Sequence, residues 1–111
     1  MVDEMTDKIK IIGISKNEHR SEYSFPKNRN SFRVIRDLLI ELNFDEEDVY
    51  HYFSDLIDSD IYNEETFGFY CEKYSVDIIF FSKRVVLIFN YKEDKQQEIA
   101  KIIDKFILEE E

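Results

Sequence analysis

The sequence is poor in the residues that build disulfides, phosphate-binding loops and membrane spans. Its one cysteine, Cys71, can form no internal disulfide, and we expect it to be a small buried hydrophobic residue. Its two glycines, Gly13 and Gly68, are isolated, which excludes the G-x-G-x-x-G and G-x-x-x-x-G-K-S/T phosphate loops. The apolar runs are far shorter than the ~20 residues of a spanning helix, and residues 1–10 lack the apolar segment of a secretory signal. We therefore expect a soluble, cytoplasmic protein.

Positive charge is missing from the middle third of the chain. Between Asp37 and Glu72 there are twelve acidic residues and no Lys or Arg, within a formal net charge of −10. A field this uneven attracts cationic partners and repels polyanions. Nucleic-acid binding would have to overcome that charge. We expect a basic protein partner, and neither nucleic acid nor membrane.

The 111 residues, 43% of them apolar and 36% charged, are typical of one globular domain. We expect it to span 1–111, with frayed ends at 1–7 and 109–111. The apolar patterning predicts an α+β fold of order β-α-α-β-β-β-α, in which helices pack on a mostly antiparallel sheet of three or four strands. The predicted strands are 8–15, 67–71, 76–81 and 85–91, and the predicted helices begin near 30, 45 and 94. Residues 16–30 are predicted to be a polar connection, and the last two strands to be covered on both faces or nearly so.

Helix boundaries are marked by polar residues. Asn30 or Ser31 can cap a first helix that runs to about Leu42, where Asn43 favours a stop. Asp45 can cap a second helix that ends near 58. In the last helix an apolar stripe of i, i+3, i+4, i+7 and i+8 spacing is predicted to face the core, and it consists of Ile99, Ile102, Ile103, Phe106 and Ile107.

The second helix carries the main functional hypothesis. Its predicted buried stripe is Val49, Phe53, Leu56 and Ile57. The opposite side then exposes Asp48, His51, Asp55 and Asp58, with no Lys at the usual i,i+4 spacing. This side is either a solvated acidic face or a docking surface for a basic protein. Interspersed tyrosines favour docking, and the candidate partner-binding residues are Glu47, Asp48, Tyr50, His51, Asp55, Asp58, Asp60, Tyr62, Glu64 and Glu65.

No catalytic or metal-binding arrangement is predicted. Ser54, His51 and Asp55 lie on neighbouring turns of one helix, which does not build an oriented triad with an oxyanion site. The start of a calcium loop at Asp58 and Asp60 lacks the required Gly and Glu at the sixth and twelfth positions. A loose cation site built from Asp58, Asp60, Glu64 and Glu65 is left open as an alternative. We therefore expect a protein that is not an enzyme, with no cofactor and no assigned metal.

Basic residues cluster at the start of the first helix, where they oppose the helix dipole. They are Lys27, Arg29, Arg33 and Arg36. The sequence favours internal salt bridges for them, with Arg33 and Asp37 as an i,i+4 pair.

These observations point to an inhibitor of the immunity or antitoxin type, which neutralises a basic, nuclease-like toxin by direct binding. The segment Ser-Asp-Ile-Tyr at 59–62 is chemically similar to the acidic, tyrosine-containing recognition segment of colicin-DNase immunity proteins, which are all-helical. The similarity concerns the chemistry of binding and not the fold. The alternatives are an assembly subunit that self-associates through its sheet, or a polyanion mimic that acts on a DNA-binding protein. Monomer and homodimer both stay open.

Overall fold

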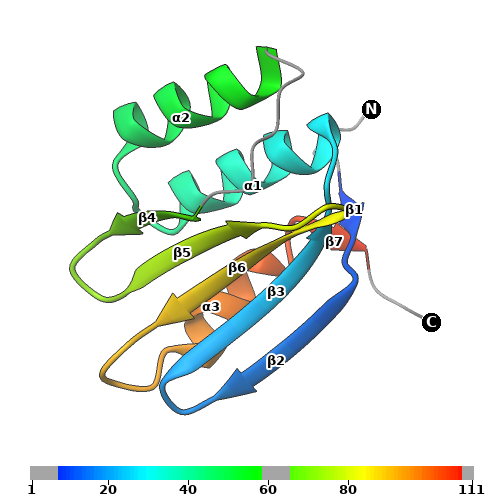
Figure 1. Cartoon of the computed structure of the whole chain (residues 1–111). Helices are drawn as coiled ribbons and strands as arrows, with labels where there is room; N and C mark the ends of the chain where they lie inside the picture. Colours follow the sequence, from blue (N-terminus) through cyan, green and yellow to red (C-terminus); the bar gives the residue numbers. More distant parts are fainter. Residues whose placement is uncertain (1–7, 59–65, 109–111) are drawn as a thin grey trace, which may run out of the picture.

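The computed structural model describes residues 8–58 and 66–108, with the backbone alone at 57, 58, 66, 67 and 108 (Figure 1). Its elements in chain order are β1 (Ile9–Lys10), β2 (Gly13–Asn17), β3 (Arg20–Pro26), α1 (Arg29–Glu41), α2 (Glu46–Asp58), β4 (Thr66–Tyr70), β5 (Ser75–Phe80), β6 (Arg84–Asn90), α3 (Gln96–Ile103) and β7 (Ile107–Leu108). The predicted α+β class and the largely antiparallel sheet are confirmed. The frayed ends that the sequence predicts lie outside the described residues.

The main sheet has five strands rather than three or four, in the order β2-β3-β6-β5-β4, and every neighbouring pair is antiparallel. A separate parallel pair joins β1 to β7, with Ile9 opposite Ile107. The backbone N–H of Ile9 also donates to the carbonyl of Phe106 at 3.1 Å. The two ends of the described chain are therefore held together beside the sheet (Figure 1).

The extra strand comes from the segment predicted as a polar connection, and that prediction is wrong. β2 continues to Asn17, turns through two residues, and returns as β3 between β2 and β6. Ser21, Tyr23 and Phe25 alternate with more exposed residues and are all buried, which is the period of two expected of a strand covered on one face. The predicted strand 8–15 is likewise divided into β1 and β2.

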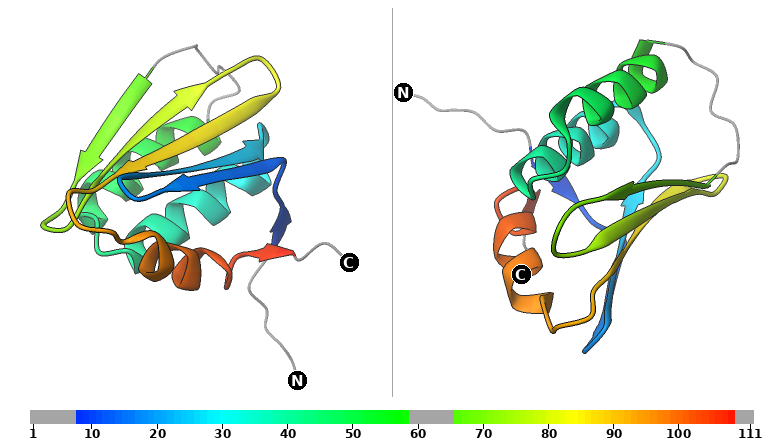
Figure 2. Two further views of the ribbon diagram at one scale, coloured as in Figure 1. Left: turned by 90° about the horizontal axis from the view of Figure 1, so that it is seen from below. Right: turned by 90° about the vertical axis from the view of Figure 1, so that its left-hand side faces the viewer.

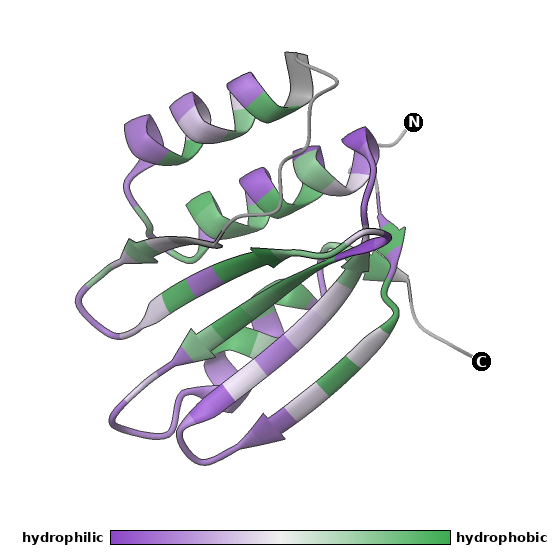
Figure 3. Cartoon of the chain, viewed as in Figure 1, coloured by the Kyte–Doolittle hydropathy of each residue, from purple (hydrophilic) through white to green (hydrophobic). Residues whose placement is uncertain are grey.

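All three helices pack on one face of the sheet (Figure 2). The inner positions of the three central strands are buried beneath them: Tyr23 and Phe25 on β3, Val76, Ile78 and Phe80 on β5, and Val85, Leu87 and Phe89 on β6. The prediction that β5 and β6 are covered on both faces, or nearly so, holds only in part for the described residues. On the outer face Val86 is buried, whereas Ile79 and Ile88 are half-buried. Asp77 interrupts the apolar run of β5, and β6 is apolar from Val85 to Phe89 (Figure 3).

The helix boundaries show which polar side chains act as caps. The predicted cap of α1 at Asn30 or Ser31 is wrong. The cap is Asn28, two or three residues earlier, whose Oδ1 accepts the backbone N–H of Ser31 at 2.8 Å. Asn43 has a φ of 73°, the left-handed conformation that ends a helix, so the predicted stop is confirmed. α3 ends at Ile103, earlier than predicted. Phe106 and Ile107 are buried as expected, but they reach the core from the segment after the helix.

Candidate functional site

The predicted orientation of α2 is confirmed by its described side chains. Val49 and Phe53 are fully buried and Leu56 is half-buried. Tyr52 packs beside them, with its ring 5.8 Å from that of Phe69 on β4. The side turned to solvent carries Ser54 and six further exposed residues, and these six are here called the acidic α2 surface: Glu46, Glu47, Asp48, Tyr50, His51 and Asp55.

The start of α2 explains why acids gather there. Asp45 Oδ1 accepts the backbone N–H of Asp48 at 3.0 Å, so the predicted cap is confirmed. Glu46, Glu47 and Asp48 then form the first turn. Carboxylates at this end complement the unsatisfied N–H groups and the positive end of the helix dipole. Local stability therefore accounts for the acids of the first turn, whereas Asp55 lies two turns further along.

The carboxylates of the acidic α2 surface have no internal counter-ion among residues 8–58 and 66–108. Two other acids of the cation-free band do have one: Glu41 accepts from Lys105 Nζ at 3.1 Å, and Asp37 accepts from Arg36 Nε at 3.0 Å. No described Lys or Arg lies within ion-pair distance of Glu46, Glu47, Asp48 or Asp55. The negative field of α2 therefore opens directly to solvent.

One cation does border this surface. The guanidinium carbon of Arg36 on α1 lies 5.3 Å from the centroid of the Tyr50 ring. Tyr50 nevertheless stays 43% exposed. The predicted pair of Arg33 with Asp37 is wrong, because Arg36 is the partner of Asp37 and the Arg33 side chain is exposed. A neighbouring residue on the same turn thus replaces the i,i+4 partner.

The remaining candidates lie outside the described residues. They are the side chain of Asp58 and all of Asp60, Tyr62, Glu64 and Glu65. The loose cation site built on them lies there too. Within the described part of the chain, no cluster of three His, Cys, Asp or Glu side chains is arranged to hold a metal ion. None of the helices there has the length and apolar composition that crossing a bilayer requires.

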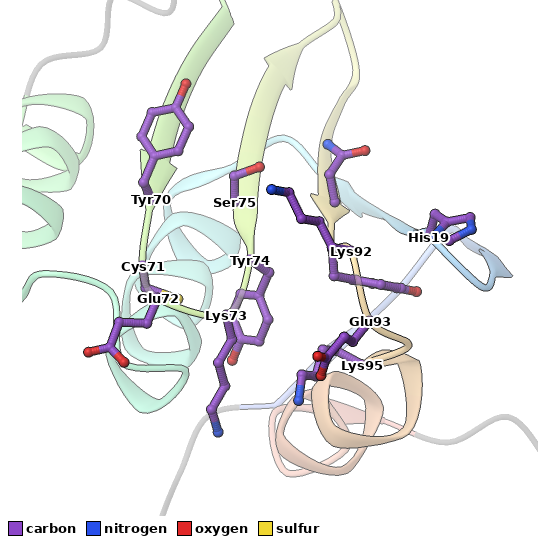
Figure 4. A pocket seen from close by; sticks show the side chains of 12 residues that line it. His19, Tyr70, Cys71, Glu72, Lys73, Tyr74, Ser75, Lys92, Glu93 and Lys95 are labelled. Carbon is purple, nitrogen blue, oxygen red and sulfur yellow. The ribbon is translucent and has the colours of Figure 1, made fainter.

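Sequence reasoning missed a cavity of about 710 Å³ at one end of the sheet (Figure 4). It lies between the β4–β5 turn, the β6–α3 connection and the β2–β3 turn, three segments that are distant in sequence. Three lysines line it, Lys73, Lys92 and Lys95, together with His19 and Tyr70. Cys71 also lines it and is half-buried against the hydrophobic core, so the expectation of a buried cysteine holds only in part. The only sequence signal was the repeated placement of Lys beside predicted turns.

Comparisons of the chain with protein-family models, curated proteins and solved structures found no match.

Proposed function

We propose that this protein is an acidic binding protein that docks a basic partner protein on the acidic α2 surface. The observation that carries the proposal is the set of four exposed carboxylates, Glu46, Glu47, Asp48 and Asp55, without a described Lys or Arg within ion-pair distance. A surface of one charge sign speeds the encounter with a surface of the opposite sign. It also disfavours partners of the same sign.

Tyr50 supplies the apolar part of the surface. Tyrosine is enriched at the energetic centre of interfaces, because its ring offers a large contact area and few rotatable bonds. The Arg36 guanidinium already lies over this ring, which is the contact that an arginine of a partner would make on the ring's exposed area. The surface thus combines long-range attraction with an aromatic contact for a cation.

The most concrete form of this function is the inhibition of a basic toxin that acts on nucleic acid. A nuclease groove must be positive to bind phosphates. An acidic helix can occupy such a groove, or cover its approach, without any catalytic group of its own. In this form the protein is an immunity or antitoxin-type inhibitor, and the polyanion mimic differs only in the partner that it engages.

Charge reversal on α2 tests the proposal. The Asp48→Lys/Asp55→Lys variant replaces two negative charges of the acidic α2 surface by two positive ones, so its net charge rises by four. The Glu18→Lys/Glu93→Lys variant adds the same charge at exposed positions near the far end of β2 and after β6. A basic partner is first isolated from the native host by its affinity for the parent protein. Its association with the parent and with each variant is then measured by stopped flow at low and high salt. We expect association to slow more than tenfold for the α2 variant and less than about twofold for the control.

Equal association rates for the two variants would contradict the acidic α2 surface as the docking site. The toxin form has its own readout, which is loss of the partner's nuclease activity at equimolar inhibitor. Binding without inhibition would retain the docking surface and reject the inhibitor.

One observation favours the alternative of self-association through the sheet. β2 is an edge strand of the main sheet, and Ile12 and Ile14 at this edge are 56% and 47% exposed. Free strand edges with apolar side chains can pair with a second copy. A dimer whose dissociation does not change between low and high salt, and that Ile14→Lys converts to monomer, would support the assembly subunit instead.

A further inference from the structure

The cavity at the end of the sheet has a polar floor that the strand register builds. Tyr70 on β4 pairs with Ser75 on β5, Ser75 pairs with Asn90 on β6, and Asn90 pairs with Arg20 on β3. Directly paired residues of antiparallel strands point to the same face. These four side chains therefore form one row across the sheet, on the face opposite to the helices.

The hollow follows this row. Tyr70, Ser75 and Asn90 line the cavity of about 710 Å³. Asn90 also lines an adjoining hollow of about 500 Å³ with Arg20, and His19 lines both. The two hollows together make a groove along the sheet end, here called the sheet-end groove. The larger of the two hollows, of about 710 Å³, is alone in the range of about 300–1,000 Å³ that small-molecule sites occupy.

The groove is richer in cations than the chain around it. Lys73, Lys92, Lys95 and His19 line the larger cavity, against the carboxylates of Glu72 and Glu93. Lys73 is neutralised by Glu98, whose Oε2 accepts from its Nζ at 3.3 Å. In the described chain Lys92 forms neither an ion pair nor a side-chain hydrogen bond.

The charges are also divided within the cavity. Lys92 extends along the sheet side toward Ser75, whereas Glu72 and Glu93 lie on the side of the turn and of α3 (Figure 4). The polar groups over the sheet row are therefore a lysine ammonium, a serine hydroxyl and an asparagine amide, all of which can donate hydrogen bonds to an anion.

Tyr70 gives the groove an aromatic end. It is 79% exposed, the highest value among the large apolar side chains of the described residues, and it stands at the opposite end of the cavity from His19 (Figure 4). A ring this exposed contributes little to the core. Beside a groove lined by donors, it offers a face on which a planar ligand can stack.

We infer that the sheet-end groove binds a small planar anion of the nucleoside monophosphate type. The aromatic ring lies against Tyr70, and the phosphate is held near Lys92 by the donors of Ser75 and Asn90. This site uses β4, β5, β6 and their turns, and no residue of the acidic α2 surface. It is independent of the proposed docking function, so either can fail without the other.

The test is a titration of the full chain with AMP, followed by backbone amide NMR at low salt. Adenosine and inorganic phosphate serve as the two half-ligands. We expect saturable shifts at Tyr70, Ser75 and Asn90 with AMP, and affinity about tenfold lower for either half-ligand. Lys92→Ala should weaken AMP binding about tenfold through loss of a charged hydrogen bond. Tyr70→Ala should weaken it about tenfold through loss of stacking.

Two variants serve as matched controls. Lys83→Ala removes the same charge from the β5–β6 turn, at the other end of the hairpin, and Phe81→Ala removes an exposed aromatic ring from the same turn. Neither residue lines the groove, and both variants should bind AMP within twofold of the parent. The inference is overturned if AMP gives no saturable shifts at the three groove residues. It is also overturned if Lys92→Ala and Tyr70→Ala bind like the controls, or if phosphate alone binds as tightly as AMP.

Discussion

The Arg36 guanidinium of α1 lies 5.3 Å from the ring centroid of Tyr50 on α2, while Arg36 Nε donates to Asp37 Oδ1 at 3.0 Å. The Arg36 side chain thus links the basic residues of α1 to Tyr50 at the edge of the acidic α2 surface. The sequence places a cluster of basic residues in the first helix, where they oppose the helix dipole. For Arg36 of this cluster, an aromatic ring and a neighbouring carboxylate offset that cost.

This relationship makes a first prediction. The cation–π contact should be worth about 0.5–1 kcal/mol, as expected at an exposed site. A double-mutant cycle of Arg36→Ala and Tyr50→Ala, measured by urea unfolding, should give that coupling energy. The control cycle replaces Arg36→Ala by Arg33→Ala, which removes an exposed arginine of the same helix. Equal coupling in the two cycles would show that the effect is general electrostatics and not the ring contact.

The second prediction concerns the rotation of α2. Phe53 is fully buried and its ring lies 5.1 Å from that of Tyr52, whereas the next residue, Ser54, is exposed. Phe53→Ala should lower the free energy of unfolding by about 3–5 kcal/mol, because it leaves a cavity. Ser54→Ala should change it by no more than about 0.5 kcal/mol. Denaturation followed by circular dichroism measures both, and the reverse ranking would place α2 with its other side inward.

Local signals predicted α2 well because they are contained in the helix itself. The cap at Asp45 and the spacing of Val49 and Phe53 are set within one or two turns of chain, as is the stop at Asn43 that ends the preceding helix, α1. The exposed side of α2 followed from the same spacing. This is why most described members of the candidate site lie where the sequence placed them.

The parts that were not predicted depend on distant partners. β3 was hidden because Ser21 occupies an inward position where an apolar residue is expected. Its hydroxyl is satisfied by the Tyr91 hydroxyl at 2.8 Å, 70 residues away in the chain. Likewise, Phe106 continues the helical spacing of α3, yet the backbone leaves the helix to pair with β1. The sheet-end groove needs three turns at once, which no single window of sequence contains.

The third prediction contrasts two buried tyrosine hydroxyls. The Tyr23 hydroxyl is buried and accepts or donates no hydrogen bond among the described residues. The Tyr91 hydroxyl donates to the Asn17 carbonyl at 2.9 Å and lies 2.8 Å from Ser21 Oγ. Tyr23→Phe should therefore stabilise the fold by about 1 kcal/mol and Tyr91→Phe should destabilise it by about 1 kcal/mol. Thermal unfolding at neutral pH separates them, and a loss of stability in Tyr23→Phe would mean that its hydroxyl has a partner.

The fourth prediction follows from the same tyrosine at high pH. Burial, with a smaller contribution from the Asp104 carboxylate, raises the pKa of Tyr23 to about 12, above the ordinary tyrosine value of 10.0. The folded state therefore holds the Tyr23 proton more tightly than the unfolded state. The contribution of this proton to the free energy of unfolding is complete below about pH 10 and is lost as the pH rises towards 12.

The free energy of unfolding of the parent should accordingly fall between pH 10 and 12, and Tyr23→Phe should remove roughly 2 kcal/mol of that fall. Tyr74, whose pKa is also raised by burial, should account for a further part, which Tyr74→Phe removes. Urea unfolding of the three proteins at pH 8, 10 and 11.5 measures the slopes. If the parent and Tyr23→Phe lose stability in parallel, the Tyr23 hydroxyl ionises as readily in the folded chain as in the unfolded one. That outcome would contradict the burial of this hydroxyl between β3 and the helices.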